Sequence, residues 1–159
     1  MNHMTIKGWP KKVSKKEIHS LVEWVSREMG LNRFRKPKLD ISIYFKKDFE
    51  KKTAYWGWVM WEDCPNRPRE FSIEIERSLS RGDLIESVIH ELVHVKQYAQ
   101  GRLKDRGCGY LFEGNHYKHI AYIHSTYSEY QEQPWEIEAQ SIQKKLYKKY
   151  ENHLKEKIV

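Results

Sequence analysis

The stretch His90-Glu91-Leu92-Val93-His94 lies in an apolar segment and decides how the middle of the chain folds. Its two histidines are four residues apart, so on a helix they lie on one face, about one turn from each other. Both imidazoles can therefore reach one metal ion. Glu91 points to a different side of that turn, where a carboxylate is better placed to contact a metal-bound water than to bind the metal. The pattern predicts a helix that carries most of a metal site.

The sequence marks both ends of this helix. Ser80 and Asp83 stand three residues apart in a capping-box relation, and Gly101 is a typical stop. Between them runs a broad apolar face, made of Leu84, Ile85, Val88, Ile89, Leu92 and Val95. A helix this apolar is expected to be buried against a sheet, which would hold the two histidines rigidly.

Three strands are expected before the motif helix, over residues 39–45, 54–62 and 70–76. The first and third alternate apolar and polar residues, and the second is rich in aromatic residues. Residues 46–53 and 63–69 are expected to be turns between them. Such short connections favour an antiparallel or mixed sheet.

Two further helices are expected, one on each side of this region. The first covers residues 14–29, with Ser14 and Glu17 as its capping box. The last begins at Pro134, because proline is tolerated in the first turn of a helix. Residues 101–133 carry four glycines and many aromatic residues and histidines, so we expect an irregular loop with a short helix over 116–124.

Composition sets limits on the class of protein. The chain has 159 residues, enough for one domain with its own core, so residues 1–159 are expected to form a single domain. Cys64 and Cys108 are far apart and form no Cys-x-x-Cys pair, so a disulfide framework is not expected and a reducing compartment fits. No apolar run is long enough for a membrane span or an export signal, so a cytoplasmic protein is expected. The net charge of +7 makes nucleic acid a candidate partner.

The motif needs a third protein ligand, and several residues are candidates. A histidine six residues after His94, with a glycine midway, would indicate the metzincin arrangement, but those positions hold Gln100 and Gln97. The third ligand is then a glutamate on the last helix or a histidine from the loop. The glutamates are Glu136 and Glu138, and the histidines are His116, His119 and His124. Periodicity alone does not choose between the two glutamates, because they flank the apolar stripe at similar angles.

Over residues 38–147 the chain resembles the minimal core of gluzincin zinc metallopeptidases. It is most similar to small phage-type metallopeptidases that join H-E-L-x-H-x-x-Q, here residues 90–97, to a later P-W-E-x-E-A, here residues 134–139. The resemblance implies an α+β, zincin-like fold that binds Zn²⁺ and hydrolyses peptide bonds, with Glu91 as general base. It also implies Glu138 as third ligand, because the ligand glutamate of gluzincins commonly precedes a small residue such as Ala139. Glu136 would then interact with the helix dipole.

The chain also resembles, more faintly, the SprT-like metalloproteases, some of which act on DNA-bound proteins. His116-Tyr-Lys-His is similar to their third-ligand segment. A different class of function is a nucleic-acid-binding module that uses the basic end of the last helix, residues 144–157. In the peptidase interpretation, Tyr130 is the first candidate for stabilising an oxyanion, followed by Tyr127 and the loop histidines. The strand over 70–76 is a candidate for pairing with an extended peptide.

Overall fold

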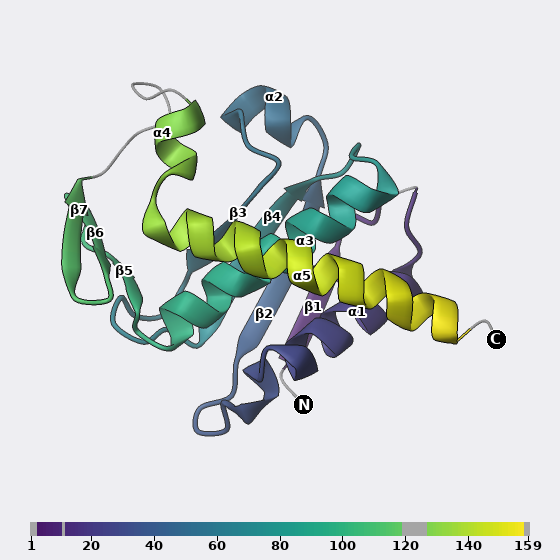
Figure 1. Cartoon of the computed structure of the whole chain (residues 1–159), viewed down its shortest axis with the longest axis horizontal. Coiled ribbons are helices and arrows are strands. Elements are labelled where there is room, and N and C mark those ends of the chain that lie inside the picture. The colour runs from purple at the N-terminus through teal and green to yellow at the C-terminus, as the bar shows by residue number, and fades with distance from the viewer. Residues whose placement is uncertain (1–2, 11, 119–126, 158–159) are drawn as a thin grey trace.

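The computed structural model describes residues 3–10, 12–118 and 127–157 of the chain (Figure 1). Within these ranges the fold is α+β, as expected, with a main sheet of four strands and a small sheet of three. The main sheet has the order β1-β2-β4-β3 and the small sheet the order β5-β6-β7. The strands of the main sheet are β1 (His3–Lys7), β2 (Asp40–Lys46), β3 (Gly57–Trp61) and β4 (Glu70–Glu76).

The main sheet is mixed rather than antiparallel. Strands β1, β2 and β4 pair in parallel, and β3 pairs with β4 in antiparallel register at one edge. The three expected strands form within two or three residues of the expected bounds. Strand β1 was not expected, because its five residues alternate too briefly to give a pattern. The expected turn at 46–53 contains a short helix, α2 (Phe49–Thr53).

One face of the main sheet forms the core. The expected alternation is confirmed, since Phe71, Ile73 and Ile75 of β4 are buried while Ser72 and Glu74 are only half-buried. This face packs against α3 (Arg81–Ala99), and α1 (Lys15–Glu28) lies beside α3 on the same side (Figure 1). Ser14 and Ser80 cap the two helices by accepting hydrogen bonds from backbone N–H groups three residues later, as expected.

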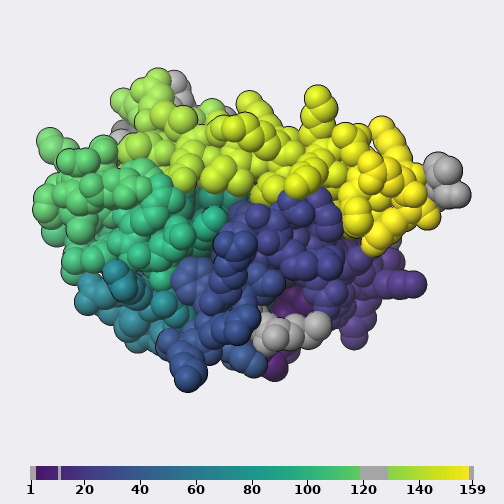
Figure 2. Space-filling view, turned by 60° about the horizontal axis from the view of Figure 1, so that its bottom comes forward, coloured from purple at the N-terminus to yellow at the C-terminus, as the bar shows by residue number. Residues whose placement is uncertain are grey.

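Helix α5 (Pro134–Glu156) crosses over α3 in the opposite direction. Arg81 at the start of α3 pairs with Glu151, whereas Gln97 near its end donates to the backbone oxygen of Trp135. Ala139 is fully buried, and its small side chain lets the helices approach closely. Figure 2 shows α5 as a band along one side of the molecule, from the small sheet to α1. The antiparallel crossing places the first turns of α5 over the second half of α3.

Within the segment 101–133, which was expected to be irregular, residues 103–118 form the small sheet. Its strands are β5 (Leu103–Asp105), β6 (Gly109–Phe112) and β7 (Asn115–Lys118). Tyr110, Phe112 and Tyr117 pack their rings around Trp135, with ring centroids 5.0–6.0 Å from it. The small sheet therefore fixes the start of α5. Of the helix expected over 116–124, residues 116–118 belong to β7, and the remainder lies outside the described residues.

Two short helices complete the described fold. Helix α4 (Tyr127–Gln131) precedes α5, and the 3-10 helix η1 (Leu31–Arg33) follows α1. Across the described ranges, no helix combines the length and the apolar character that crossing a bilayer requires.

Candidate metal centre

Three side chains from two helices meet where α3 and α5 cross. The Nε2 atoms of His90 and His94 lie 3.1 Å apart. Glu136, in the first turn of α5, places one carboxylate oxygen 3.1 Å from His90 Nε2 and the other 3.2 Å from His94 Nε2. Within the described residues, these three form the group of His, Cys, Asp and Glu side chains whose ligand atoms are close enough to hold one metal ion.

The spacing of these atoms fits a small ion between them. Two nitrogens bound tetrahedrally to zinc, each at about 2.0–2.1 Å, would lie about 3.3 Å apart. The observed separation of 3.1 Å between the two Nε2 atoms is close to this value. Two imidazoles and one carboxylate, with a fourth position left open, are also a donor set of catalytic zinc sites.

Gln97 determines which nitrogen of His94 carries the proton. Its amide Nε2 donates to the Trp135 backbone oxygen at 3.1 Å and to the Glu138 carboxylate at 3.0 Å, and both of these groups only accept. The amide oxygen of Gln97 therefore faces His94 Nδ1, 2.8 Å away. An amide oxygen cannot donate, so Nδ1 of His94 must carry the hydrogen, and in the neutral ring Nε2 keeps its lone pair.

Gln143 does the same for His90. Its amide nitrogen donates to the carboxylate of Glu86 at 2.6 Å, and its amide oxygen lies 2.9 Å from His90 Nδ1. Both neutral rings thus hold their protons on Nδ1 and direct the lone pairs of Nε2 toward Glu136. Hydrogen bonds of this kind on the far nitrogen orient metal-binding histidines and make them more basic.

Three electron-pair donors therefore face one another and require a positive charge. In the metal-free protein a proton supplies it. Burial disfavours the charged imidazolium of His94, but the Glu136 carboxylate outweighs this effect and raises the pKa of His94 to about 9. Burial likewise opposes ionisation of Glu136, but the two histidines hold its pKa well below its usual range. A divalent cation would satisfy all three groups at once.

Glu91 lies beside this group without joining it. Its side chain is buried, and it forms no hydrogen bond with any residue in the described part of the chain. Burial raises the pKa of Glu91, although the neighbouring histidines act in the opposite direction. A Cβ atom at Gly57 would lie only 3.1 Å from a Glu91 carboxylate oxygen, so glycine at this position leaves room for that carboxylate.

Two clefts with different linings open onto the site. The aromatic cleft, about 280 Å³, is lined by His94, Tyr98, Tyr110 and Trp135. The polar cleft, about 640 Å³, is lined by His90, Glu50, Glu86 and Lys144. Both clefts are also lined by Tyr55, Gly57, Glu91, Tyr130 and Glu136. Glu91 and Glu136 therefore line both clefts, as residues where two parts of one groove meet would do.

The expectation that Glu138 completes the site is corrected by its position. His90 and His94 come together as expected, but the carboxylate beside them belongs to Glu136. Glu138 instead forms a two-pronged ion pair with Arg102, with distances of 2.9 and 3.1 Å, and accepts a hydrogen bond from Gln97. The two glutamates are about 200° apart around the helix, so only one of them can face the histidines.

The sequence itself contains signals that favour Glu136 over Glu138 as the third ligand. Gln143 follows Glu136 by seven residues, which places both on one face of α5, where they flank His90. Arg102, just after α3, needs a carboxylate partner, and Glu138 provides it. Gln97, which excludes the metzincin arrangement, also lies three residues after His94, a spacing that suits a supporting hydrogen bond.

The other candidate residues have different outcomes. His116 lies exposed on β7 and is not part of the group, and His119 and His124 lie outside the described residues. Tyr130 does reach the site, where its hydroxyl donates to Glu136 Oε1 at 3.0 Å. The side chain of Tyr127 lies outside the described part of the structure. Strand β4 cannot pair with a peptide, because β2 and β3 occupy both of its edges.

Comparisons with known proteins add no relative to this description. A scan against protein-family models, a search of curated proteins and a search of solved structures each found no match.

Proposed function

We propose that the chain is a zinc-dependent metallopeptidase with His90, His94 and Glu136 as ligands and Glu91 as general base. The observation that carries this proposal is the position of Glu91: a buried carboxylate, without a hydrogen-bond partner among the described residues, lies between the ligand group and two open clefts. A site that served only to stabilise the fold would have no use for such a carboxylate.

Each residue has a role in the proposed reaction. A bound zinc ion would lower the pKa of a coordinated water and polarise the carbonyl group of the substrate. Glu91 would accept the proton of the attacking water and pass it to the leaving amine. Its raised pKa suits a group that must both take and give a proton near neutrality. Burial also raises the pKa of Tyr130, which keeps its hydroxyl protonated and able to donate to an oxyanion.

The surroundings of the site suit a peptide substrate. In the described part of the main sheet, β3 is an edge strand, and four consecutive residues of β3 line the aromatic cleft. An extended peptide can pair with such an edge through its main chain and place alternate side chains in the clefts. Trp56 and Met60 are large, exposed apolar side chains and lie one in each cleft. We therefore assign peptide pairing to β3 rather than to the strand over 70–76.

The decisive experiment separates zinc binding from catalysis. Glu91→Gln removes the base but no ligand, so this variant should bind one zinc ion like the wild type and hydrolyse a pool of fluorogenic peptides at least about a hundredfold more slowly. Glu23→Gln, an exposed position on α1, is the matched control and should keep full activity. Zinc content is measured by mass spectrometry of the metal. Full hydrolysis by Glu91→Gln would disprove this mechanism, and a zinc-loaded wild type that cleaves no peptide would disprove the function.

A further inference from the structure

The connection between α1 and β2 concentrates positive charge. We define the basic loop as residues 33–38, Arg-Phe-Arg-Lys-Pro-Lys. The surrounding segment 29–39 carries these four basic residues and no acidic residue, so it supplies four of the chain's seven net positive charges. The basic end of α5, in contrast, intersperses its lysines with glutamates.

The fold makes no use of these charges. Arg33, Arg35, Lys36 and Lys38 are all exposed, and none of them forms an ion pair or a side-chain hydrogen bond with any residue that the structure describes. The segment is held instead by its apolar residues, since Leu31 and Leu39 are fully buried. Like charges so close together repel one another, so the cluster opposes folding unless an anion is bound.

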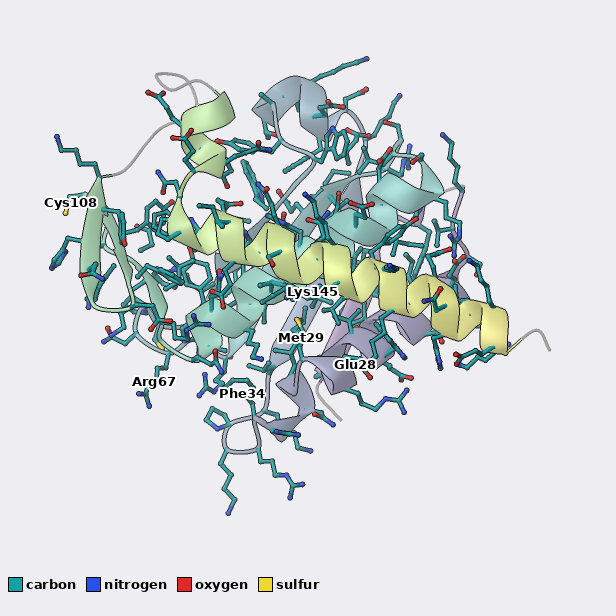
Figure 3. All side chains as sticks on the ribbon, viewed as in Figure 1. Glu28, Met29, Phe34, Arg67, Cys108 and Lys145 are labelled. Carbon is teal, nitrogen blue, oxygen red and sulfur yellow. The ribbon has the colours of Figure 1, made fainter. Side chains whose placement is uncertain are left out.

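The loop has a defined shape and basic neighbours. Arg35 and Lys38 form an antiparallel bridge, which closes the loop as a small hairpin. The guanidinium of Arg69 lies 4.9 Å from the centre of the Phe34 ring and bonds the backbone oxygens of Arg67, Pro68 and Ala99. Arg69 thus joins Phe34 of the loop to the segment that carries the exposed Arg67, and Figure 3 shows Phe34 and Arg67 at the same end of the molecule.

A cleft extends this positive surface along the side of α1. It has a volume of about 1010 Å³. Its charged and titratable lining residues are Arg27, Arg35, Lys38, His3, His19 and one carboxylate, that of Glu23, and apolar side chains such as Met4, Val22 and Ile41 line it as well. The arrangement is therefore a projecting basic hairpin beside a cleft that basic and apolar residues line together. Neither feature contributes a residue to the metal centre.

We propose that the basic loop binds the phosphate backbone of double-stranded nucleic acid. A duplex carries one negative charge per about 1.7 Å of its axis, and arginine and lysine side chains that neutralise phosphates release counterions. A single strand would favour exposed aromatic side chains for base stacking, but the one aromatic side chain of the loop, Phe34, is half-buried, and Arg69 lies against its ring. A protein partner would favour an apolar centre, and a membrane surface exposed apolar groups, neither of which the loop offers.

The test compares two variants of equal charge. In the first, Arg33, Arg35, Lys36 and Lys38 are all changed to glutamine. In the second, the exposed lysines of the C-terminal region, Lys145, Lys148, Lys155 and Lys157, are changed in the same way. Each variant lowers the formal net charge from +7 to +3. Binding to a short fluorescein-labelled DNA duplex is followed by anisotropy between about 50 and 200 mM salt, and circular dichroism verifies the fold.

The loop variant is expected to bind the duplex at least about tenfold more weakly at the lowest salt, and to lower the slope of log K against log salt by about 3 to 4. The control variant should keep a slope close to that of the wild type. Equal losses in both variants would show that only diffuse charge attracts DNA and would overturn the proposal. Failure of the wild type to bind duplex, or equal binding of polyglutamate at the same charge concentration, would overturn it as well. None of these outcomes depends on peptide hydrolysis.

Discussion

The contact between α3 and α5 has two sides that differ in one respect, the source of their positive charge. On the metal-facing side, His90, His94 and Glu136 direct only lone pairs and a negative charge toward a common point. On the supporting side, Glu138 meets the guanidinium of Arg102. The second group provides its own cation, whereas the first has none except a bound proton.

This difference indicates why the first group could hold a metal ion, whereas the second could not. Arginine is always charged, so the pair of Arg102 and Glu138 is complete in the folded chain and can only stabilise the structure. The histidines and Glu136 are held in place, partly by that same structure, yet remain short of one cation. Gln97 joins the two sides, because its amide group bonds both His94 and Glu138.

Replacing the carboxylate on one side or the other of this contact should give the largest difference in zinc affinity. Glu136→Gln removes a negatively charged ligand, so we expect the zinc affinity to fall by at least about a thousandfold. This loss is larger than the 10- to 100-fold fall in affinity, roughly, that follows when a supporting hydrogen bond is lost. Competition against a chromophoric chelator measures the affinity. Glu138→Gln is the matched control, two residues away on the same helix. A larger loss of zinc from Glu138→Gln than from Glu136→Gln would restore the original ligand assignment.

The second-largest expected effect is a dependence on pH. As the pH rises, the metal-free protein should lose stability, whereas the affinity for zinc should increase. The pKa of His94 is raised to about 9 from its ordinary 6.5, so its protonation stabilises the metal-free fold below pH 6.5, and this stabilisation is lost as the pH rises through 9. The loss amounts to about 3 kcal/mol. Zinc must displace that proton, so its affinity should rise about tenfold per pH unit below 9.

Urea unfolding of the chelator-treated protein and zinc competition, both at several pH values, measure these two trends. The Glu136→Gln variant is the control, because without that carboxylate the pKa of His94 should fall and both slopes should flatten. A metal-free protein that becomes more stable between pH 6.5 and 9 would contradict the arrangement of charges around His94.

The sequence alone was sufficient for the metal-facing half of α3. Five residues with helical spacing determine where His90, Glu91 and His94 point, and local capping by Ser80 sets the start of the helix. The strands of the core were likewise predictable, because burial on one face imposes a period of two on residues such as Phe71, Ile73 and Ile75. These features depend on short-range geometry.

The partner of the motif depended on long-range geometry and could not be read in the same way. Which glutamate faces α3 depends on the rotation of α5 about its axis. The packing of Trp135 against the small sheet and the pairing of Arg102 fix that rotation. The small sheet itself was missed because its strands have only three or four residues, too few to establish a pattern among glycines.

A smaller effect is expected from the residues that orient the histidines. Gln97→Ala and Gln143→Ala each remove the acceptor for one Nδ1–H, and each should weaken zinc binding by about 10- to 100-fold without removing a ligand. Gln140→Ala, which lines the same polar cleft but bonds neither histidine, is the control. Unchanged affinity in both variants would show that packing alone orients the two rings.

The smallest effect should come from the supporting side. Glu138→Gln weakens the ion pair with Arg102, and because both side chains are about 30% exposed, we expect a loss of only about 1 kcal/mol in the free energy of unfolding. Zinc affinity should change by less than about tenfold, because Gln97 can still donate to the new amide oxygen and to Trp135. Chemical denaturation of the metal-free protein measures the first quantity. Gln97 connects the two sides, so the supporting side is expected to affect zinc binding only through the Gln97 amide. The double variant Gln97→Ala, Glu138→Gln tests this expectation. Its loss of zinc affinity should equal the loss measured for Gln97→Ala alone.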